Sequence, residues 1–463
     1  MKLYPEQQVV VDKCVAHINK PKNKPGVCVC PTSFGKSLVI SELARVCGLK
    51  TIVISPSKEL LSQNYEKLLA LGGEASIYSA SANSKEIGNL TYATLGSIKS
   101  LGTVFKEWGV GLVIIDECDR GIPPAKNSMF SKFIKDLQPK SIIGFTATPF
   151  YNKPGGFGEP TTLRMMNRVR PKIFYDFIHV TQIQEMIAND RWTPIKYKAY
   201  EFNEKKLVIN SAGSDFTEES IRRYNEVEGI NNKIYLEIKS FLAEGVDKIL
   251  VFCDSVETAK RFTEVIPNSA FVDGLTPKKE RDSIVENFKN GNLNVLFNYG
   301  TFSVGYDHPE LQVLIMGRAT GSFSLHYQLV GRLVRKHPSK KEALFVDFGG
   351  NYKRFGPLDE ITIEDHHTNG WSLFNGENLL SGYVLGSTPI TKKDLDKKLP
   401  KTILVSDYEF TFGKHQGKKL HEVPRSYLEW LCSDNFESTA QWMTNVIKVC
   451  KKYLEESKLE QLV

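Results

Sequence analysis

The sequence lacks paired cysteines. Its 463 residues include eight cysteines, and no two of them have the C-x-x-C spacing of a zinc ribbon or finger. Cys28 and Cys30 lie in the apolar run 27–30, so we expect them to be buried thiols of the core. Scattered free cysteines are typical of a reducing cytoplasm. The pattern therefore argues against structural zinc and favours a cytoplasmic protein.

Long apolar runs, targeting segments and low-complexity tracts are also missing. The N-terminus lacks the basic, apolar and small-residue regions of a signal peptide, and no apolar run is long enough to span a bilayer. We therefore expect no membrane partner. Positive charge is in small excess only: 60 Lys and Arg residues against 53 Asp and Glu residues give a net charge of +7. This mildly basic balance permits a nucleic-acid partner without requiring one.

What is present is an alternation of short β-branched runs with stretches of helical spacing. A chain of this length is expected to form two to four domains. The alternation predicts an α/β fold with two units, each a parallel sheet flanked by helices. We expect strands at 27–30, 51–54, 112–115 and 142–145 in the first unit, and at 248–253, 294–297, 312–316 and 343–348 in the second.

Changes in composition predict the domain boundaries. The small polar stretch 211–214 separates an N-terminal domain at 1–210 from a second domain at 211–350. Residues 351–463 then form a largely polar accessory region. Aromatic residues and helical spacing return from about residue 405 and indicate a small module at about 405–463.

Residues 30–37, with the sequence Cys-Pro-Thr-Ser-Phe-Gly-Lys-Ser, resemble a phosphate-binding loop between a strand and a helix. Backbone N–H groups at a helix N-terminus bind phosphate, and the helix dipole adds to them. Gly35 supplies the bend, Lys36 reaches the terminal phosphates, and Ser37 offers a hydroxyl to Mg²⁺. Cys30 replaces the first glycine of the G-x-x-x-x-G-K-[ST] pattern. The context predicts ATP and Mg²⁺ as cofactors.

Two carboxylates follow the predicted strand 112–115. We expect Asp116 to hold Mg²⁺, directly or through water, and Glu117 to orient and deprotonate the attacking water. The alternative is a solvated strand end that happens to be acidic. A phosphate loop on an upstream strand favours the catalytic interpretation, because the carboxyl ends of parallel strands share one edge of the sheet.

Gln328, Arg332 and Arg335 are spaced i, i+4 and i+7, which on a helix places them on one face. Two guanidinium groups that project from one unit toward a nucleotide on the other would stabilise charge on the transferring phosphoryl group. We therefore expect all three residues to be catalytic. The alternative is a basic, solvated helix face.

In this order, the motifs resemble those of the superfamily 2 helicases over roughly residues 1–350. The matching stretches are the glutamine motif at 3–7, motif I at 30–37, motif Ia at 55–60, motif Ib at 92–94, D-E-C-D at 116–119 near the family's D-E-x-H, T-A-T-P at 146–149 (motif III), motif IV at 251–253, motif V at 301–307 and Q-x-x-G-R-x-x-R at 328–335 (motif VI). The resemblance implies two tandem RecA-like parallel-sheet lobes with one ATP between them, and a small C-terminal accessory domain. It implies nucleotide contacts from Gln7, Thr32, Ser33, Phe34, Gly35, Lys36, Ser37, Gly305 and Asp307.

The resemblance also implies a DNA-binding surface. Motifs Ia, Ib, IV and V of the family usually touch the nucleic-acid backbone, and motif III couples hydrolysis to lobe movement. Binding through the backbone is independent of base sequence and sensitive to salt. The candidate residues here are Pro56, Ser57, Lys58, Thr94, Thr148, Ser255 and Thr301.

Three further segments resemble proteins that act on branched or duplex DNA. Residues 298–305 are similar to fork-regression and branch-migration helicases such as those of T5-like phages, and 347–351 and 191–194 resemble DNA repair and restriction-type translocases. We therefore expect an ATP-dependent helicase that unwinds or branch-migrates forks and Holliday junctions in recombination, repair or replication. If the protein is phage-encoded, its place is the host cytoplasm.

The stretch 151–171 interrupts the α/β alternation with a glycine-rich turn and several arginines. We interpret it as a wedge loop that separates strands, in which Phe157 stacks on a base and Arg168 holds a phosphate. The alternative is an ordinary solvated connector.

The tail resembles a small F-G-K-x-x-G-K module found at the ends of some DNA exonucleases. Its glycines and lysines at 412–419 predict a turn that binds DNA, with Tyr427, Trp430 and Leu431 in the module's core. The alternative is a structural cap on the second lobe.

Three other functions stay open on sequence alone. The first is a double-stranded DNA translocase that never separates strands, although no nuclease or methyltransferase signature accompanies it. The second is an RNA helicase. The third is a nucleotide-gated clamp that binds DNA without processive movement.

Overall fold

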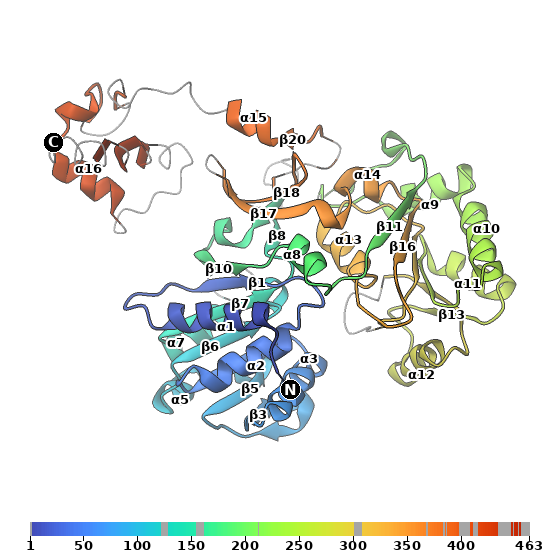
Figure 1. Cartoon of the computed structure of the whole chain (residues 1–463), viewed down its shortest axis with the longest axis horizontal. Coiled ribbons are helices and arrows are strands. Elements are labelled where there is room, and N and C mark those ends of the chain that lie inside the picture. Colours follow the sequence, from blue (N-terminus) through green and yellow to red (C-terminus); the bar gives the residue numbers. More distant parts are fainter. Residues whose placement is uncertain are drawn as a thin grey trace. The chain divides into compact units, whose positions relative to one another are not determined.

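The computed structural model describes the chain except residues 1, 122–127, 154–161, 212, 301–307, 367–368, 383–384, 386, 398–407, 411–414, 434–445, 448, 452 and 455–463 (Figure 1). The chain divides into two compact units, Met1–Glu364 with Trp371–Pro389, and Asp365–Gly370 with Ile390–Val463. Four predicted site residues lie outside the described residues: Phe157, Thr301, Gly305 and Asp307.

The first unit begins with an eight-stranded sheet in the order β10-β1-β7-β6-β2-β5-β3-β4. Its neighbouring strands are parallel, apart from the β3–β4 pair. The strands are β1 (Gly26–Val29), β2 (Thr51–Ser55), β3 (Ser76–Ser79), β4 (Ser84–Lys85), β5 (Leu90–Thr94), β6 (Leu112–Asp116), β7 (Ser141–Thr146) and β10 (Asp176–Val180). The helices are α1 (Pro5–Ile18), α2 (Lys36–Val46), α3 (Lys58–Ala70), α4 (Leu95–Ile98), α5 (Gly102–Glu107), α6 (Cys118–Gly121), α7 (Met129–Leu137) and α8 (Ile183–Ala188).

A second sheet has six parallel strands in the order β11-β16-β15-β12-β14-β13. These are β11 (Ile195–Ala199), β12 (Ile249–Phe252), β13 (Ser269–Val272), β14 (Val295–Asn298), β15 (Val313–Met316) and β16 (Ala343–Asp347). Its helices are α9 (Glu218–Val227), α10 (Ile230–Ala243), α11 (Val256–Val265), α12 (Lys278–Lys289), α13 (Phe323–Val330) and α14 (Asn351–Phe355). Two parallel sheets with flanking helices confirm the predicted α/β class.

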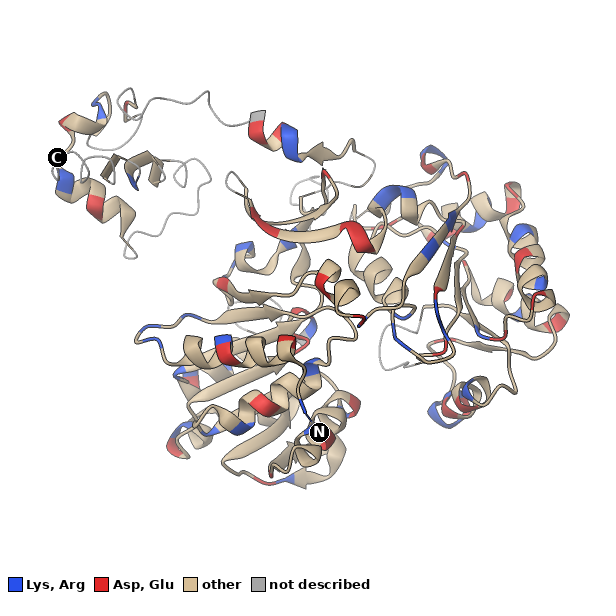
Figure 2. Ribbon diagram, viewed as in Figure 1, with Lys and Arg blue, Asp and Glu red and all other residues tan. Residues whose placement is uncertain are grey.

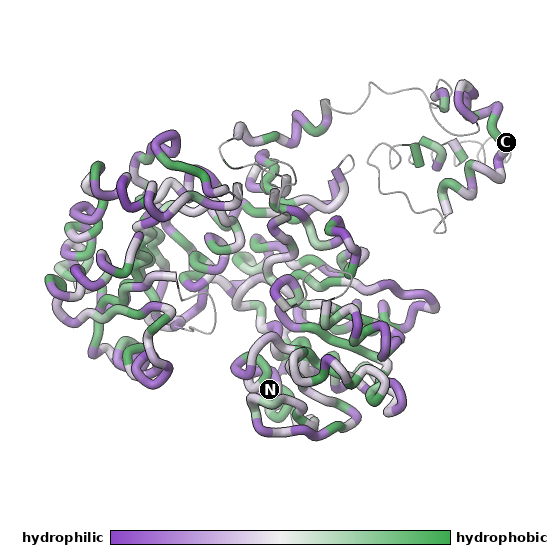
Figure 3. Tube along the Cα trace, turned by 180° about the vertical axis from the view of Figure 1, so that it is seen from behind, coloured by the Kyte–Doolittle hydropathy of each residue, from purple (hydrophilic) through white to green (hydrophobic). Residues whose placement is uncertain are grey.

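The inner strands are buried on both faces, which explains why they appear in the sequence as unbroken apolar runs. β1, β2, β6 and β7 are buried at every position, as are β12, β14 and β15. Helices cover them with one apolar face: α7 buries Phe130, Phe133 and Leu137 at helical spacing. The hydrophobic stretches accordingly follow the strands in Figure 3, and charged residues gather on outer helices such as α10 and α12 in Figure 2.

The second sheet includes a strand that precedes the predicted boundary at residue 211. β11 pairs in parallel with β16 from Ile195 to Ala199. It was missed because it is an edge strand whose lysines alternate with apolar residues, so it lacks the continuous apolar run of an inner strand. The chain thus passes between the sheets before residue 195. The division into three domains at 210 and 350 stays a prediction.

Residues 151–171 do not form a simple loop. β8 (Phe150–Lys153) and β9 (Thr162–Met165) pair as an antiparallel hairpin, followed by a short 3₁₀ helix at Met166–Arg168. Later in the first unit, β18 (Gly370–Asn375) lies between β17 (Ile361–His366) and β19 (Asn378–Leu379) in a small sheet. The hairpin's tip, residues 154–161, lies outside the described residues.

The second unit contains β20 (Ile390–Thr391), α15 (Lys392–Lys397), a 3₁₀ helix at Leu420–Glu422 and α16 (Arg425–Cys432). Phe410, Leu420, Leu428 and Leu431 form a small core. As predicted, Leu431 belongs to this core and Tyr427 packs against it. Trp430 is 47% exposed and lies outside the core, with its ring 5.6 Å from that of Tyr427, because adjacent residues on a helix face different directions. No helix among the described residues is long and apolar enough to cross a membrane.

Candidate nucleotide site

The phosphate loop joins the carboxyl end of β1 to the first turn of α2. Ser33 has φ 64° and Gly35 has φ 85°, so both adopt a left-handed backbone. That conformation costs a non-glycine residue roughly 1–2 kcal/mol. Ser33 adopts it at the position where the family pattern has glycine. Gly35 has no room for a side chain, since a Cβ there would lie 2.5 Å from Gln7 Nε2. Lys36 then begins the helix, as predicted.

Lys36 forms an ion pair with Glu117 in this structure. Their side chains are 15% and 21% exposed, so water screens the pair only partly. Burial lowers the pKa of Lys36, but the attraction of Glu117 and Asp116 outweighs burial and raises that pKa above its usual value. Glu117 has φ 46°, an uncommon conformation for glutamate. The loop lysine therefore lies charged beside both predicted catalytic carboxylates.

Asp116 ends β6 and is 3% exposed. Burial and the repulsion of Glu117 raise the pKa of Asp116 to about 6, against the attraction of Lys36. Asn64 on α3 donates its Nδ2 to Asp116 Oδ2 at 2.8 Å and to Ser55 Oγ at 3.2 Å. Sequence reasoning missed Asn64. Its only signal is a polar residue on the buried face of α3, between Leu61 and Leu68.

The oxygen donors of this region fit Mg²⁺. Mg²⁺ is usually held by one or two carboxylates together with phosphates and waters. Asp116 supplies a buried carboxylate, and because burial and Glu117 raise its pKa despite Lys36, a bound cation would stabilise its charged form. Ser37 supplies a hydroxyl from the first turn of α2. Among the described residues, no three His, Cys, Asp or Glu side chains form a group that would hold a metal unaided, so the nucleotide's phosphates would complete the site.

Asp119 connects the carboxylate strand to β7. Thr146 donates to its Oδ1 at 2.6 Å, and Thr148 donates to its Oδ2 at 2.7 Å. Burial, and then the repulsion of Glu117, raise the pKa of Asp119, while these two hydrogen bonds lower it. Thr148 is 2% exposed. This position favours a coupling role for Thr148 over the predicted DNA contact, because its hydroxyl is already donated inside the protein.

Gln7 ties the N-terminal segment to the phosphate loop. Its Nε2 donates to the Phe34 carbonyl at 2.7 Å, and its Oε1 accepts from the Tyr4 backbone N–H at 2.9 Å. The guanidinium of Arg191 lies 3.3 Å from the centroid of the Tyr4 ring and donates to Glu6 Oε1 at 2.7 Å. Gln7 is thus placed beside the loop; its contact with adenine stays a prediction.

The three residues of motif VI do not share a helix face. α13 ends at Val330, and Gly331 caps it, so Arg332 and Arg335 lie in the turn that follows. Gly331 has no room for a side chain, since a Cβ there would lie 2.8 Å from the Tyr327 carbonyl and 3.0 Å from Thr32 Oγ1. Burial lowers the pKa of Arg335. The helical-spacing prediction was wrong, but the turn does lie against the phosphate loop.

Two family models match consecutive parts of this chain. "Type III restriction enzyme, res subunit" covers residues 1–151, and "Helicase conserved C-terminal domain" covers residues 232–337. The chain therefore carries domains similar to both halves of a helicase, and its two parallel sheets are the tandem RecA-like lobes that the sequence predicted.

Known proteins of this class resemble the chain over most of its length. It is 28% identical to the "Putative ATP-dependent helicase IRC3" of Saccharomyces cerevisiae, over 74% of this chain and 51% of that protein. It is 22% identical to the "DNA 3'-5' translocase XPB2" of Sulfurisphaera tokodaii, over 70% of this chain and 78% of that one. The chain thus spans about half of the yeast relative's length.

A solved structure shares the helicase fold. It is the "ATP-dependent Type ISP restriction-modification enzyme LlaBIII bound to DNA", with a TM-score of 0.54 and 15% identity over 74% of this chain and 27% of that one.

The predicted DNA-contacting residues of the helicase lie where strands pass into helices. Ser57 and Ser255 cap α3 and α11, one in each lobe, and each accepts a hydrogen bond from a backbone N–H of its helix. Pro56 and Lys58 are exposed. Thr94 Oγ1 lies 3.2 Å from Ser79 Oγ at the end of β5. Arg168 is half-buried after the β8–β9 hairpin. DNA contact by these residues stays a prediction.

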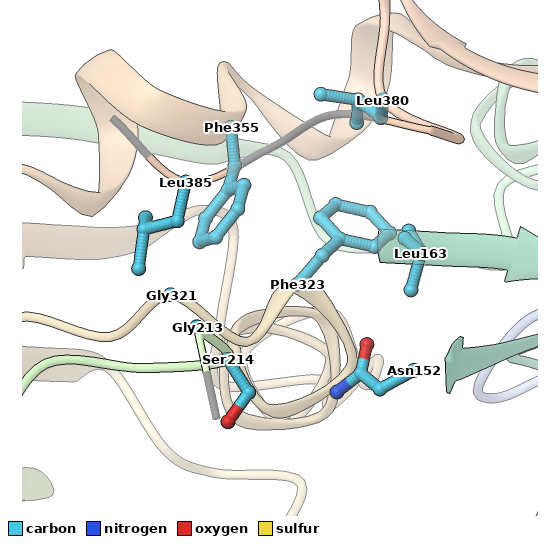
Figure 4. Close-up of a pocket in the computed structure, with 9 residues that line it drawn as sticks. All are labelled: Asn152, Leu163, Gly213, Ser214, Gly321, Phe323, Phe355, Leu380 and Leu385. Carbon is cyan, nitrogen blue, oxygen red and sulfur yellow. The ribbon is translucent and has the colours of Figure 1, made fainter. Parts of the chain in front are cut away.

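The stem of the β8–β9 hairpin packs on α13, the helix that precedes the motif VI turn. The Phe150 and Phe323 rings lie 5.4 Å apart, and Phe323 and Phe355 lie 5.5 Å apart. A cavity of about 30 Å³ remains beside them (Figure 4). It is lined mainly by apolar side chains, of which Phe323, Phe355 and Leu163 come from three separate elements. The hairpin of the first lobe is therefore in direct contact with the second.

Proposed function

We propose that this protein is an ATP-dependent DNA helicase that remodels forked and four-way-junction DNA. The observation that carries the proposal is the charged group Lys36, Glu117 and Asp116, which lies at the carboxyl edge of the first sheet. Its charges suit phosphate and Mg²⁺, and the motif VI turn packs on the adjacent loop residue Thr32. Because ATP would be bound between the two lobes, cleavage of its terminal phosphate bond could change the position of one lobe relative to the other.

The ion pair suggests how hydrolysis begins. A terminal phosphate at the N-terminus of α2 would compete with Glu117 for Lys36. Glu117 would then be free to accept a proton from the attacking water, while Lys36 neutralises the phosphate. Asp116 and Ser37 would hold Mg²⁺, which supplies charge neutralisation at the phosphates. Arg332 and Arg335 would approach the same phosphates from the second lobe.

Movement along DNA requires a grip on each lobe that alternates with ATP. Pro56, Ser57, Lys58 and Thr94 would provide the grip of the first lobe, and Ser255 that of the second. Because such contacts go to the DNA backbone, binding should weaken steeply with salt and ignore base sequence. The contact of the hairpin with α13 supports a role for the hairpin in strand separation, since closure of the lobes would act on it directly.

DNA as the substrate is supported by the similarity to a relative named as a DNA translocase. The preference for branched DNA rests on the resemblance of residues 298–305 to fork-regression and branch-migration helicases.

A single comparison tests the proposal. ATP-driven strand separation is measured on a plain duplex, a fork and a four-way junction of the same base sequence, with matched RNA duplexes. We expect fork and junction to be processed faster than plain duplex, and RNA not at all. Lys36→Ala should abolish both turnover and movement, whereas Lys99→Ala, at an exposed position outside the site, should match the wild type. Preference for the RNA duplex would overturn the proposal.

A translocase that moves on duplex DNA without separating strands is the second candidate, favoured by the name of the archaeal relative. Displacement of streptavidin from biotinylated duplex DNA distinguishes it. Streptavidin displacement without strand separation would identify a translocase, and tight nucleotide-dependent binding without either would identify a clamp.

A further inference from the structure

We propose that the crossover segment, Asp190–Thr193, positions the arginines of motif VI against the phosphate loop, with Trp192 as its central positioning residue. This inference rests on the proposed ATPase activity. The segment lies between α8 and β11, where the chain passes from the first sheet to the second. It belongs to neither sheet, and its four residues together contact the glutamine motif, the phosphate loop and the motif VI turn with its next residue Lys336.

Trp192 faces the phosphate loop. Its indole Nε1–H donates to the Thr32 carbonyl at 2.8 Å, and its side chain is 3% exposed. The side chain of Thr32 lies beside motif VI. Its Oγ1 is 3.0 Å from the position that a Cβ on Gly331 would occupy. Thr32 is therefore in contact with the crossover segment through its carbonyl and with motif VI through its side chain.

The same segment fixes the backbone of the motif VI turn. Trp192 and Arg335 form an isolated antiparallel bridge. The Thr193 backbone N–H donates to the Val334 carbonyl at 2.8 Å, and Thr193 Oγ1 donates to the Arg335 carbonyl at 3.0 Å. Because α13 has already ended at Val330, the turn that carries Arg332 and Arg335 has no helix to define its path. The hydrogen bonds to Trp192 and Thr193 hold the backbone of the turn instead.

Ionic contacts flank this bridge on both sides. Asp190 Oδ1 accepts from Lys336 Nζ at 2.5 Å, next to the motif VI turn. Arg191 pairs with Glu6 and lies over the Tyr4 ring, next to the glutamine motif. The crossover segment thus contacts the glutamine motif, the phosphate loop and the arginine turn within four residues. A shift of the turn relative to the loop must break the bridge or displace Thr32.

Trp192→Phe tests the proposal. A six-membered aromatic ring stays at the buried position, but the pyrrole ring and the N–H that it donates to the Thr32 carbonyl are lost. We expect kcat for DNA-stimulated ATP hydrolysis to fall about tenfold, which corresponds to about 1.4 kcal/mol. Trp108→Phe is the matched control. It removes an indole N–H that donates to the Gly88 carbonyl at 3.2 Å, outside the site, and should leave kcat unchanged.

A double-mutant cycle separates positioning from a merely structural role. If Trp192 acts by placing the arginine turn, then Trp192→Phe should lower kcat less than twofold when Arg335 is already alanine. Equal effects in both backgrounds would overturn the proposal, as would wild-type turnover by Trp192→Phe.

A binding measurement tests the role of the crossover segment even if the wild type does not hydrolyse ATP. A non-hydrolysable ATP analogue with Mg²⁺ should raise the melting temperature of the wild type and of Trp108→Phe by the same amount, and that of Trp192→Phe by less. Absence of ATPase activity in the wild type would overturn the proposed function alone. Equal thermal shifts in all three proteins would overturn the role of the crossover segment alone.

Discussion

Thr148 donates its hydroxyl to Asp119 across 2.7 Å, and this bond joins the D-E-C-D stretch after β6 to motif III after β7. Thr146 occupies the other oxygen of the same carboxylate. The family pattern D-E-x-H has histidine where this chain has Asp119. The aspartate nevertheless makes the connection, because two threonine donors suit an acceptor-only carboxylate. The segment that contains Glu117, the proposed base, is thereby linked to the chain that leads into the β8–β9 hairpin.

Removing the Thr148 hydroxyl should uncouple ATP hydrolysis from strand separation. In Thr148→Ala we expect DNA-stimulated ATP turnover to persist and the unwinding rate to fall about tenfold, within the range typical of coupling free energies. Both rates are measured on the same forked DNA. Thr148→Ser keeps the hydroxyl and should retain the wild-type ratio of unwinding to turnover. A proportional fall of both rates in Thr148→Ala would contradict the coupling role.

The parts of the fold that the sequence predicted are those that depend on local pattern. Buried parallel strands appear as unbroken apolar runs, so β1, β2, β6 and β7 were found. The phosphate loop was found because Gly35, Lys36 and Ser37 must be contiguous to act. β11 was missed, because its alternating lysines are those of an edge strand.

The parts that escaped prediction depend on contacts between distant residues. The spacing of Gln328, Arg332 and Arg335 favours a helix, but α13 ends at Val330 and the backbone of Arg335 pairs with Trp192 and Thr193 instead. Asn64 and Trp192 carry no motif of their own, since an amide on a helix and an indole in a connector are ordinary residues. Their roles become visible only from the groups to which they donate in the folded protein. Asn64 donates to Asp116, and Trp192 donates to the Thr32 carbonyl.

Asn64 should tune the affinity of the site for Mg²⁺. Asn64→Leu removes the amide that donates to Asp116, so the carboxylate becomes harder to ionise. We expect the Mg²⁺ concentration for half-maximal ATP turnover to rise about tenfold, the scale typical of residues that support a metal ligand. Asn225→Leu is a matched control, because Asn225 donates to Asp254 at 2.9 Å in the second lobe. Its Mg²⁺ requirement should equal that of the wild type, and a rise in both variants would refute the assignment.

His326 should make the protein less stable in mild acid. It is buried on α13 between Phe345 and Phe355, and no described residue hydrogen-bonds to either ring nitrogen. Burial, and then the charge of Arg354, lower the pKa of His326 to about 3 from 6.5. Between these values the unfolded chain binds a proton that the folded chain does not. Stability is therefore fully present above pH 6.5 and is lost as the pH falls toward 3.

The contribution of this histidine is measured by urea unfolding at several pH values. The free energy of unfolding of the wild type should fall more steeply between pH 6.5 and 4 than that of His326→Leu, by up to about 1.4 kcal/mol per pH unit. His421→Leu, at an exposed position, should keep the wild-type slope. Equal slopes in the wild type and His326→Leu would show that the ring titrates normally in the folded protein.

The tip of the β8–β9 hairpin should be needed for strand separation and dispensable for ATP hydrolysis. Lys153 and Thr162 are paired neighbours across the hairpin, so residues 154–161 can be replaced by the two-residue turn Asn-Gly without disturbing the stem. The stem would keep Phe150 on Phe323 and thus its contact with α13. We expect DNA-stimulated turnover close to that of the wild type and a large loss of unwinding on forks. Arg168→Ala in the full-length hairpin tests the phosphate contact separately, and should weaken fork binding more at low salt than at high salt. If the shortened protein unwinds forks at the wild-type rate, strand separation is performed elsewhere in the molecule.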